Sequence, residues 1–485
     1  MKVALFGATG LVGRALALRL RRDGHHVRAW VRNPTRAAGL LGAEVERVGA
    51  SDDDAAMVAM LEGCDAIVNV AGEPVAQRWP KSVRGRLVDS RVGLNRRIVG
   101  ALPLCRVRPR IWMQASAVGF YGDRGDEELD ESASSGEGFL AALCRDWEAS
   151  AFAARDLGLR VACLRIGLVL ATDGGVLPAV ATPTRLGLGA FLGSGRQSVP
   201  WIHLTDLVEL FVTGLVDDRY EAAINAVAPE PVDQRGFADA VAKQLRRPRL
   251  LRVPAFALRL ALGEAAVVVL SGQRVVPARA LALGFRFAFT TLRAALLDLQ
   301  GGGSAPTIAA VSSWPKAAYL DERRPRFCLE TRIALSSPIE EVMPFFEKAA
   351  NLGAMTPSHM GFEILGDAPA AIHVGTTIDY RIRLGPATLR WRTRIDQIDD
   401  RGFVDCQLRG PYRAWYHQHT FEPAGRGTVM VDRVWYAPPL GVLGLLAQWL
   451  FIGRQLRQIF GHRHQCARFR FGDGRHGDSD HSGSQ

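Results

Sequence analysis

The chain has 485 residues, too many for one hydrophobic core, so we expect two or three domains. Hydrophobic residues make up 48% and charged residues 22%, which fits a soluble globular protein and excludes a disordered or fibrous one. The net charge of +11 comes from arginines spread along the whole chain. No dense basic run with interleaved aromatic residues is present, so we expect no nucleic-acid partner.

The most apolar stretches are residues 253–270 and 438–452, and both are too short or too charged for a transmembrane segment. The sequence leaves open whether the second stretch contacts a membrane surface. Residues 1–6 form a short apolar run that meets a glycine-rich turn at once, which indicates a strand and not a signal peptide. The seven cysteines are scattered, odd in number and without a CxxC pair, which favours reduced thiols. We therefore expect a cytoplasmic protein.

In the first 187 residues, strand-like and helix-like segments alternate. The expected helices include residues 11–22 and 147–157. The expected strands are residues 3–6, 27–31, 44–48, 66–70, 111–115 and 161–166. This alternation predicts an α/β Rossmann-type fold, a doubly wound parallel sheet with helices on both faces. Residues 187–300 are less regular, and we expect them to form a small substrate lobe.

After a glycine-rich joint at residues 300–306 the pattern changes. A strand at 327–335 leads to a helix that starts near 336–341, with Pro338 in its first turn. A closing helix is expected at 440–469. The strands expected between them are residues 376–384, 388–396, 403–408, 415–422 and 427–436. This order predicts a separate α+β domain.

Residues 7–13 read GATGLVG and lie between the first expected strand and helix. Gly7 permits a tight turn, Gly10 lets backbone N–H groups approach a pyrophosphate at the helix end, and Gly13 lets the helix pack closely on the sheet. Thr9, Leu11 and Val12 complete this candidate cofactor loop. The alternative is an ordinary glycine-rich turn, but the strand before it and the helix and strand after it favour a dinucleotide site.

The end of the second expected strand decides between NAD and NADP. A NAD site usually places Asp or Glu there, and this chain has Arg32, where the 2′-phosphate of NADP would lie. Arg36 could add a second contact, and a solvated strand end is the alternative reading for Arg32. Asp52, Ala71 and Gly72 follow the third and fourth strands, where adenine and ribose contacts would fall. We therefore expect NADP, with NAD the less favoured cofactor.

These features resemble the extended short-chain dehydrogenase/reductase superfamily, and in particular its uncharacterised branch of sugar-nucleotide epimerase-like proteins, which end in a small domain of unknown function. The resemblance covers residues 1–300 and implies a carbonyl or sugar-nucleotide substrate. Its carriers are residues 7–13, 71–74, 78–79, 90–91, 114–122, 144–148, 164–167, 186–189, 193–197, 201–203 and Asp206, followed by 253–256, 272–274 and 284–287.

The second domain resembles the START-like (SRPBCC) ligand-binding superfamily. Its carriers are residues 337–340, 410–415, 417–419, Phe421 and 432–436. The resemblance implies a helix-grip fold around an apolar cavity, and so an apolar ligand. The sequence leaves open whether the chain forms a homodimer. The expected domains are a Rossmann domain at 1–240, a small family-specific domain at 241–298, a linker at 299–320, the START-like domain at 321–471 and a disordered tail at 472–485.

The superfamily resemblance implies a catalytic Ser or Thr, a Tyr, and a Lys four residues after that Tyr. Ser116 matches the first of these, with Tyr121 nearby. With Glu148 as the marker on the helix, the Tyr and Lys positions hold Leu140 and Cys144, so the usual proton relay is missing.

Three readings follow from the missing relay. The first is an active oxidoreductase or epimerase in which Tyr121 is the substitute acid or base. In the second, the Cys144 thiol contributes, which would need a lowered pKa. In the third, hydride chemistry is lost and the domain senses NADPH.

Three further residues lie in the stretches that bind substrate in relatives. Arg165 and Arg196 would suit phosphate or carboxylate groups. His203 would join them, with a structural histidine beside Asp206 as an equally good reading. In the second domain, His417 and His419 alternate to one face of a strand, but a metal site needs a third ligand, so we expect a polar face and no metal.

Overall fold

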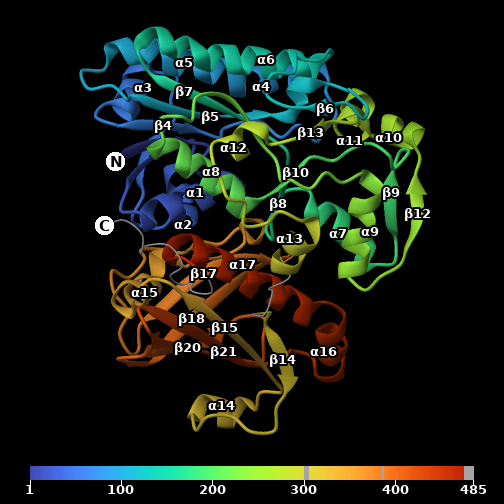
Figure 1. Ribbon diagram of the computed structural model, residues 1–485. Helices are drawn as coiled ribbons and strands as arrows, with labels where there is room; N and C mark the ends of the chain where they lie inside the picture. Colours follow the sequence, from blue (N-terminus) through green and yellow to red (C-terminus); the bar gives the residue numbers. More distant parts are fainter. Residues whose placement is uncertain (300–304, 385–386, 474–485) are drawn as a thin grey trace. The chain divides into compact units, whose positions relative to one another are not determined.

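The structure is a computed structural model that describes residues 1–299, 305–384 and 387–473. The chain forms two compact units (Figure 1): residues 1–34 with 45–299, and residues 35–44 with 300–485. Gly301–Gly303 of the expected joint and nearly all of the expected tail lie outside the described residues. Each unit is described separately below.

The first unit is built on a seven-stranded parallel sheet with the order β11-β7-β5-β4-β1-β2-β3. Its strands are β1 (Lys2–Phe6), β2 (His26–Val31), β3 (Glu46–Gly49), β4 (Ala66–Asn69), β5 (Ile111–Ala117), β7 (Arg160–Ile166) and β11 (Ala222–Ala226). The expected parallel sheet is therefore confirmed. Its central strands are almost wholly apolar and buried because helices cover both faces.

Helices α1 and α8 pack together on one side of the sheet, and α3, α5 and α6 pack together on the other (Figure 1). The helices and short strands of the unit are α1 (Leu11–Arg22), α3 (Asp54–Leu61), α4 (Lys81–Val88), α5 (Leu94–Ala101), β6 (Glu128–Leu129), α6 (Phe139–Phe152), β8 (Leu168–Leu170), α7 (Leu177–Arg185), β9 (Gly189–Leu192), β10 (Trp201–His203), α8 (Leu204–Val216), α9 (Gln234–Gln244), β12 (Arg249–Val253), α10 (Ala255–Leu262), α11 (Val267–Leu270), β13 (Arg274–Val275), α12 (Ala278–Ala282) and α13 (Leu292–Leu299).

One helix of the first unit differs from its expected bounds. The helix expected at 147–157 begins earlier, at Phe139, and its α-helical part ends at Phe152. Gly138, with φ +89°, precedes it, and a 3-10 turn over Ala153–Leu157 follows. The earlier start matters for function because it places Leu140 and Cys144 on the same helix as Glu148.

The second unit contains an eight-stranded antiparallel sheet with the order β14-β15-β21-β20-β19-β18-β17-β16. Its strands are β14 (Thr307–Ala310), β15 (Phe327–Leu335), β16 (Glu363–Ile364), β17 (Thr377–Leu384), β18 (Ala387–Asp399), β19 (Gly402–Arg409), β20 (Ala414–Ala424) and β21 (Gly427–Ala437). The helices are α2 (Pro34–Leu41), which spans the division between the units, α14 (Ala318–Arg323), α15 (Ile339–Phe346), α16 (Gly441–Ala447) and α17 (Gly453–Phe471).

The closing helix expected at 440–469 is interrupted. A π-helical turn at Gln448–Ile452 separates α16 from α17, and α17 continues to Phe471. Leu456 and Phe460 of α17 pack against the sheet in a core that includes Leu329 and Tyr436. The apolar side of α17 therefore anchors the helix to the sheet.

The linker expected at 299–320 is wrong from Thr307 onward. Strand β14 pairs with β15 and forms the edge of the sheet. Tyr319 of α14 is buried, and its hydroxyl donates to the carbonyl oxygen of Gln407 at 2.9 Å. This strand could not be predicted, because a four-residue edge strand is too short to show a clear alternation.

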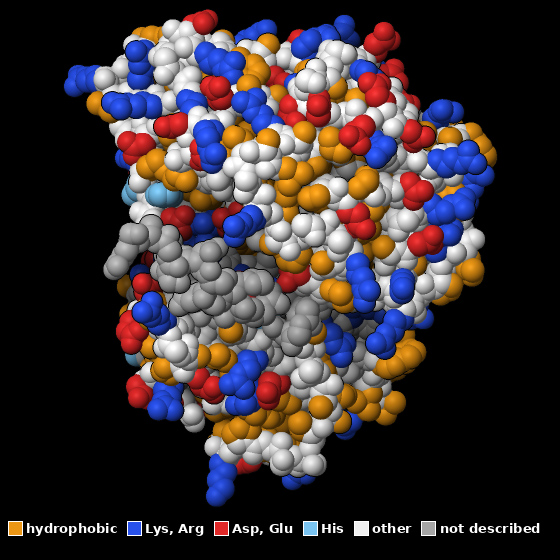
Figure 2. All heavy atoms as spheres, viewed as in Figure 1, with side chains coloured by type: hydrophobic (Ala, Val, Ile, Leu, Met, Phe, Trp, Pro, Cys, Tyr) orange, Lys and Arg blue, Asp and Glu red, His pale blue; other side chains and the backbone are white. Residues whose placement is uncertain are grey.

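The surface carries charge of both signs. On the face shown in Figure 2, lysine and arginine side chains are interspersed with aspartate and glutamate. Within residues 1–299, 305–384 and 387–473, no helix is long and apolar enough to cross a membrane.

Candidate functional site

The turn between β1 and α1 requires glycine at two positions. Gly7 has φ +79°, and a Cβ atom there would lie 2.7 Å from the backbone nitrogen of Ala71. A Cβ atom on Gly13 would lie 2.2 Å from the carbonyl oxygen of Gly7. Both distances are shorter than any real contact, so the close approach of helix and turn depends on these two residues.

The amino end of α1 is open to an anion. The helix begins at Leu11 with Gly10 as its N-cap, and in the part of the chain that the structure describes no side chain caps this end. No acidic residue occupies the first turn, and Thr9 and Gly10 are exposed. The free N–H groups of Leu11 and Val12 and the positive helix end therefore offer a site for a phosphate group.

The neighbouring strand ends supply the other candidate cofactor residues. Phe6 of β1 is paired with Trp30 of β2, so the exposed Arg32 follows β2 at the same edge of the sheet as the glycine turn. Asp52 is exposed and lies 3.5 Å from the Arg97 guanidinium. The structure therefore places these predicted cofactor residues around one edge of the parallel sheet.

After β4, the loop that holds Ala71 and Gly72 is fixed from two sides. The backbone nitrogen of Ala71 donates to Asn69 Oδ1 at 3.0 Å. A Cβ atom on Gly72 would lie 2.9 Å from Arg91 Nη2. Arg91 is buried and donates to the carbonyl oxygen of Glu73 at 2.9 Å. Asn69 and Arg91 hold this loop, a structural role that the sequence did not predict for either residue.

A buried polar network connects the predicted catalytic residues. Ser116 at the end of β5 donates to Glu148 Oε1 at 2.6 Å. Arg165 of β7 makes a two-pronged ion pair with Glu148, with both N–O distances 2.9 Å. Arg165 Nη1 also donates to the Tyr121 hydroxyl at 2.9 Å. The structure therefore brings Ser116, Tyr121 and Arg165 together, with Glu148 at the centre.

The Tyr121 hydroxyl has its hydrogen-bonding capacity filled. It lies 2.7 Å from Asn225 Oδ1 and 3.0 Å from the carbonyl oxygen of Asp130, both acceptors for its proton. Burial raises the pKa of Tyr121 above its usual value, although the Arg165 charge acts in the opposite direction. The hydroxyl is therefore protonated at neutral pH and held within the protein.

The residues at the positions of the missing Tyr and Lys are apolar or unreactive. Leu140 and Cys144 lie next to the 3-10 turn that carries Tyr121, each within 3.7 Å of a Cβ placed on Gly119. The Cys144 thiol is buried, and burial raises its pKa to about 12. A thiol of this kind remains protonated at neutral pH, which argues against the reading in which Cys144 takes part in catalysis.

The other two candidate substrate residues lie in different surroundings. His203 is fully buried, caps the start of α8 by accepting from the Thr205 backbone nitrogen at 3.2 Å, and packs on the Phe289 ring with centroids 3.9 Å apart. This geometry favours the structural reading of His203. Arg196 is exposed on a loop after β9. It stays a predicted substrate residue.

Comparisons with known proteins agree with this geometry. The model of the NAD dependent epimerase/dehydratase family matches residues 3–225, and the model of a domain of unknown function, DUF1731, matches residues 253–299. The chain is 37% identical over 298 residues to an epimerase family protein, the chloroplastic SDR39U1 homologue of Arabidopsis thaliana. The match covers 61% of this chain and 86% of the relative.

Two further relatives give the same result. The chain is 32% identical to the Bacillus subtilis epimerase family protein YfhF, over 62% of this chain and 98% of the relative. It is 30% identical to the human epimerase family protein SDR39U1, solved as a crystal structure with NADPH. That structure aligns with a TM-score of 0.56 and covers 62% of this chain and 99% of the human chain.

The fold and the glycine turn define a Rossmann-type protein with the site of a dinucleotide binder. The sequence identities extend over most of each relative's length. The chain therefore belongs to the NAD dependent epimerase/dehydratase family, in the SDR39U1-like branch that carries the DUF1731 domain.

We predict that Gly13→Ala destabilises the first unit by about 1–3 kcal/mol, because the added methyl group overlaps the Gly7 carbonyl oxygen. The measurement is urea unfolding of the full chain. Gly85→Ala on α4 is the matched control, since a Cβ atom there meets nothing within 4 Å. Equal stability of the two variants would show that the close packing of α1 on the turn is unimportant.

Proposed function

We propose that the first unit is an NADP-dependent oxidoreductase or epimerase with an atypical active site. The observation that carries the proposal is the open amino end of α1, which lies beside the exposed Arg32 at one edge of the sheet. The NADPH in the crystal structure of the human relative supports the choice of cofactor. When bound, the nicotinamide ring supplies or accepts a hydride.

The residues of this chain fit such a cofactor. The N–H groups of the turn bind the pyrophosphate, and Gly7 and Gly13 leave the space that a side chain would fill. Arg32 presents several N–H donors and a fixed positive charge to a 2′-phosphate. The substrate class that we propose is a small molecule with a carbonyl group, including a sugar nucleotide.

Replacing Arg32 by alanine tests the cofactor assignment. We expect Arg32→Ala to lose about 1.5–3 kcal/mol of NADPH binding, the range for hydrogen bonds to charged groups, which is roughly a 10–150-fold weaker Kd. NADH affinity should not change, because NADH lacks the 2′-phosphate. Calorimetric titration measures both, with the exposed Arg108→Ala as the control. Equal affinities of the unmodified protein for NADH and NADPH would contradict the assignment.

The hydrogen-bonded position of Tyr121 is compatible with two functions. In the enzyme, Ser116 orients the substrate oxygen and Tyr121 exchanges a proton with it. In the alternative, the protein binds NADPH as a regulatory sensor with weak or no catalysis. The specific observation in favour of the sensor is that the Tyr121 hydroxyl and the Ser116 hydroxyl are both engaged with buried protein groups.

The pH dependence of the reaction separates these functions. As a base in alcohol oxidation, Tyr121 must lose its proton, and burial raises its pKa above the usual value of about 10. The rate of NADP⁺ reduction should therefore be low at pH 7 and rise about tenfold per pH unit toward pH 10. Tyr121→Phe should remove this activity and leave NADPH binding intact.

The control for this experiment is Tyr220→Phe, a buried tyrosine of the same unit. A melting curve of Tyr121→Phe checks the fold, since Arg165 and Asn225 lose a partner at a cost of about 1–3 kcal/mol. An undiminished rate in Tyr121→Phe would eliminate this tyrosine as the base. Tight NADPH binding with no hydride transfer to or from a panel of carbonyls and alcohols would favour the sensor.

We also propose that the second unit is a START-like domain that holds an apolar ligand. An antiparallel sheet with a long C-terminal helix packed against it supports this fold. The unit contains a cavity of about 170 Å³, enough for a molecule of at least benzene size. Apolar residues line it, among them Phe345, Met355, Ile378, Ile395, Phe403 and Leu456. The seven cysteines are present as thiols, which supports the proposed cytoplasmic location.

Filling the cavity tests the apolar site. The full chain should bind the fluorescent probe N-phenyl-1-naphthylamine, and Ile395→Trp should weaken binding at least tenfold because the larger side chain occupies the space. Val442→Ser removes an exposed apolar side chain of α16 and should have no effect. Loss of binding in Val442→Ser, with none in Ile395→Trp, would place the probe on the surface and contradict the proposal.

A further inference from the structure

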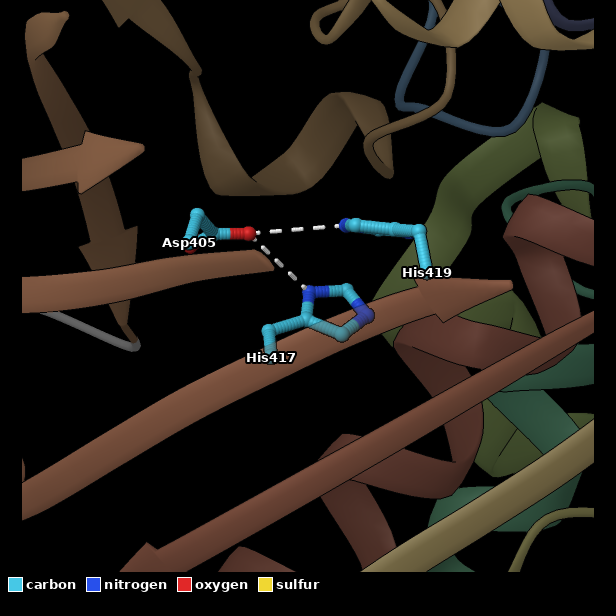
Figure 3. Close-up of side chains that lie close together, drawn as sticks. All are labelled: Asp405, His417 and His419. Atoms are coloured by element: carbon cyan, nitrogen blue, oxygen red, sulfur yellow. Dashed lines mark ion pairs between the residues drawn. The ribbon is translucent and has the colours of Figure 1, made fainter. Parts of the chain in front are cut away.

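Three ligand-type side chains meet on the wall of the second unit's cavity. Asp405 of β19 is paired with His417 of β20, and His419 lies two residues farther along β20 on the same face (Figure 3). Both histidines are buried, and all three side chains line the cavity. Sequence reasoning placed the two histidines on one face but lacked a third ligand, which the strand register supplies as Asp405.

One atom of each side chain points toward the other two side chains. Asp405 Oδ2 lies 3.6 Å from His417 Nδ1 and 3.4 Å from His419 Nε2. The imidazole centroids are 3.8 Å apart. The other carboxylate oxygen, Asp405 Oδ1, accepts from the Thr393 hydroxyl at 2.8 Å. Thr393 therefore orients the carboxylate so that Oδ2 points at the two histidines.

A second carboxylate lies against the outer nitrogens of both histidines. Asp432 Oδ1 lies 3.1 Å from His417 Nε2 and 2.7 Å from His419 Nδ1. Arg463 Nη2 also lies 3.3 Å from His419 Nδ1. A neutral imidazole carries one proton, and with that proton on the outer nitrogen of each ring Asp432 Oδ1 can accept it. The nitrogens that face Asp405 are then left with lone pairs.

In that tautomer the inner atoms, Asp405 Oδ2, His417 Nδ1 and His419 Nε2, are three acceptors that face one another. Within the cluster, two carboxylates, Asp405 and Asp432, lie beside one guanidinium, that of Arg463. Burial of a charge in an apolar cavity is costly unless a counter-charge is present. A bound cation satisfies all three acceptors.

We propose that Asp405, His417 and His419 bind a divalent transition-metal ion such as Zn²⁺. Around a tetrahedral Zn²⁺ with bonds of about 2.0–2.1 Å, ligand atoms lie about 3.4 Å apart, and the two carboxylate-to-histidine distances are 3.4 and 3.6 Å. Asp432 is the outer carboxylate that orients both metal-binding rings. Two histidines and one carboxylate suit zinc or ferrous iron.

The proposed metal has an open side. Three protein ligands leave at least one coordination position, as in catalytic metal sites. The Phe403 and Phe460 rings flank the histidines at centroid distances of 4.3 and 5.4 Å, so the surroundings of this position are apolar. The ligand chemistry that fits is an apolar molecule with one oxygen or nitrogen donor, bound by the metal at that donor. This inference is independent of cofactor binding by the first unit.

The full chain, stripped of metal with a chelator and titrated with Zn²⁺ against a chromophoric competitor, should bind one equivalent tightly. Asp405→Asn and His419→Gln should each weaken this binding at least 100-fold, and Asp432→Asn should weaken it by roughly 10–100-fold. The exposed His373→Gln is the matched control and should bind like the unmodified chain. Removal of residues 474–485, which contain His476 and His481, should also leave the tight site unchanged.

X-ray absorption of the zinc-loaded full chain provides a test that needs no variant. We expect nitrogen and oxygen ligands near 2.0–2.1 Å, two of them imidazoles. Melting curves of the metal-free variants show whether each variant remains folded. If a variant is unfolded, the X-ray absorption spectrum of the unmodified chain tests the proposal. The proposal is overturned by zinc binding that is equal in the unmodified chain and Asp405→Asn, by the absence of a stoichiometric site, or by a spectrum with sulfur ligands or without imidazole.

Discussion

The ion pair between Arg165 and Glu148 is the interaction on which the centre of the first unit depends. It joins β7 to α6, and through hydrogen bonds to Ser116 and Tyr121 it also reaches β5 and the turn that follows it. Both side chains are almost completely buried. Removal of one partner from such a pair typically costs about 3–5 kcal/mol, because the other charge is left without compensation in a medium of low polarity.

The same pair determines what the active site can do. In the relay typical of the superfamily, a lysine lowers the pKa of a tyrosine that faces the substrate. Here the positive charge near Tyr121 belongs to Arg165, whose own charge is already balanced by Glu148. Burial then outweighs the Arg165 charge, and the pKa of Tyr121 is raised. These hydrogen bonds favour a fixed position of Tyr121 over easy proton exchange. The turn between β1 and α1 has an uncapped helix end and the close contacts of Gly7 and Gly13.

The buried polar side chains of the second unit are arranged differently from those of the first. Its Asp405, His417 and His419 side chains line a cavity, so their inner atoms are accessible to a ligand, whereas the Glu148 and Arg165 side chains are fully occupied with each other. A filled network stabilises a fold, and acceptors that converge on an open space provide a binding site. The chain therefore joins a dinucleotide-binding unit to a unit whose cavity combines apolar walls with one group of ligand atoms.

The sequence by itself determined the features that depend on neighbouring residues. The glycine spacing at residues 7–13 and the alternation of strands and helices predicted the parallel sheet, because both follow from local backbone geometry. Only the tertiary structure brought Asn225 to Tyr121 and Asp405 to the two histidines, since these pairings depend on strand order and register between distant segments. The short edge strand β14 and the buried state of His203 were decided in the same way. A strand pairing or a burial is a property of the whole packed chain, and no local pattern encodes it.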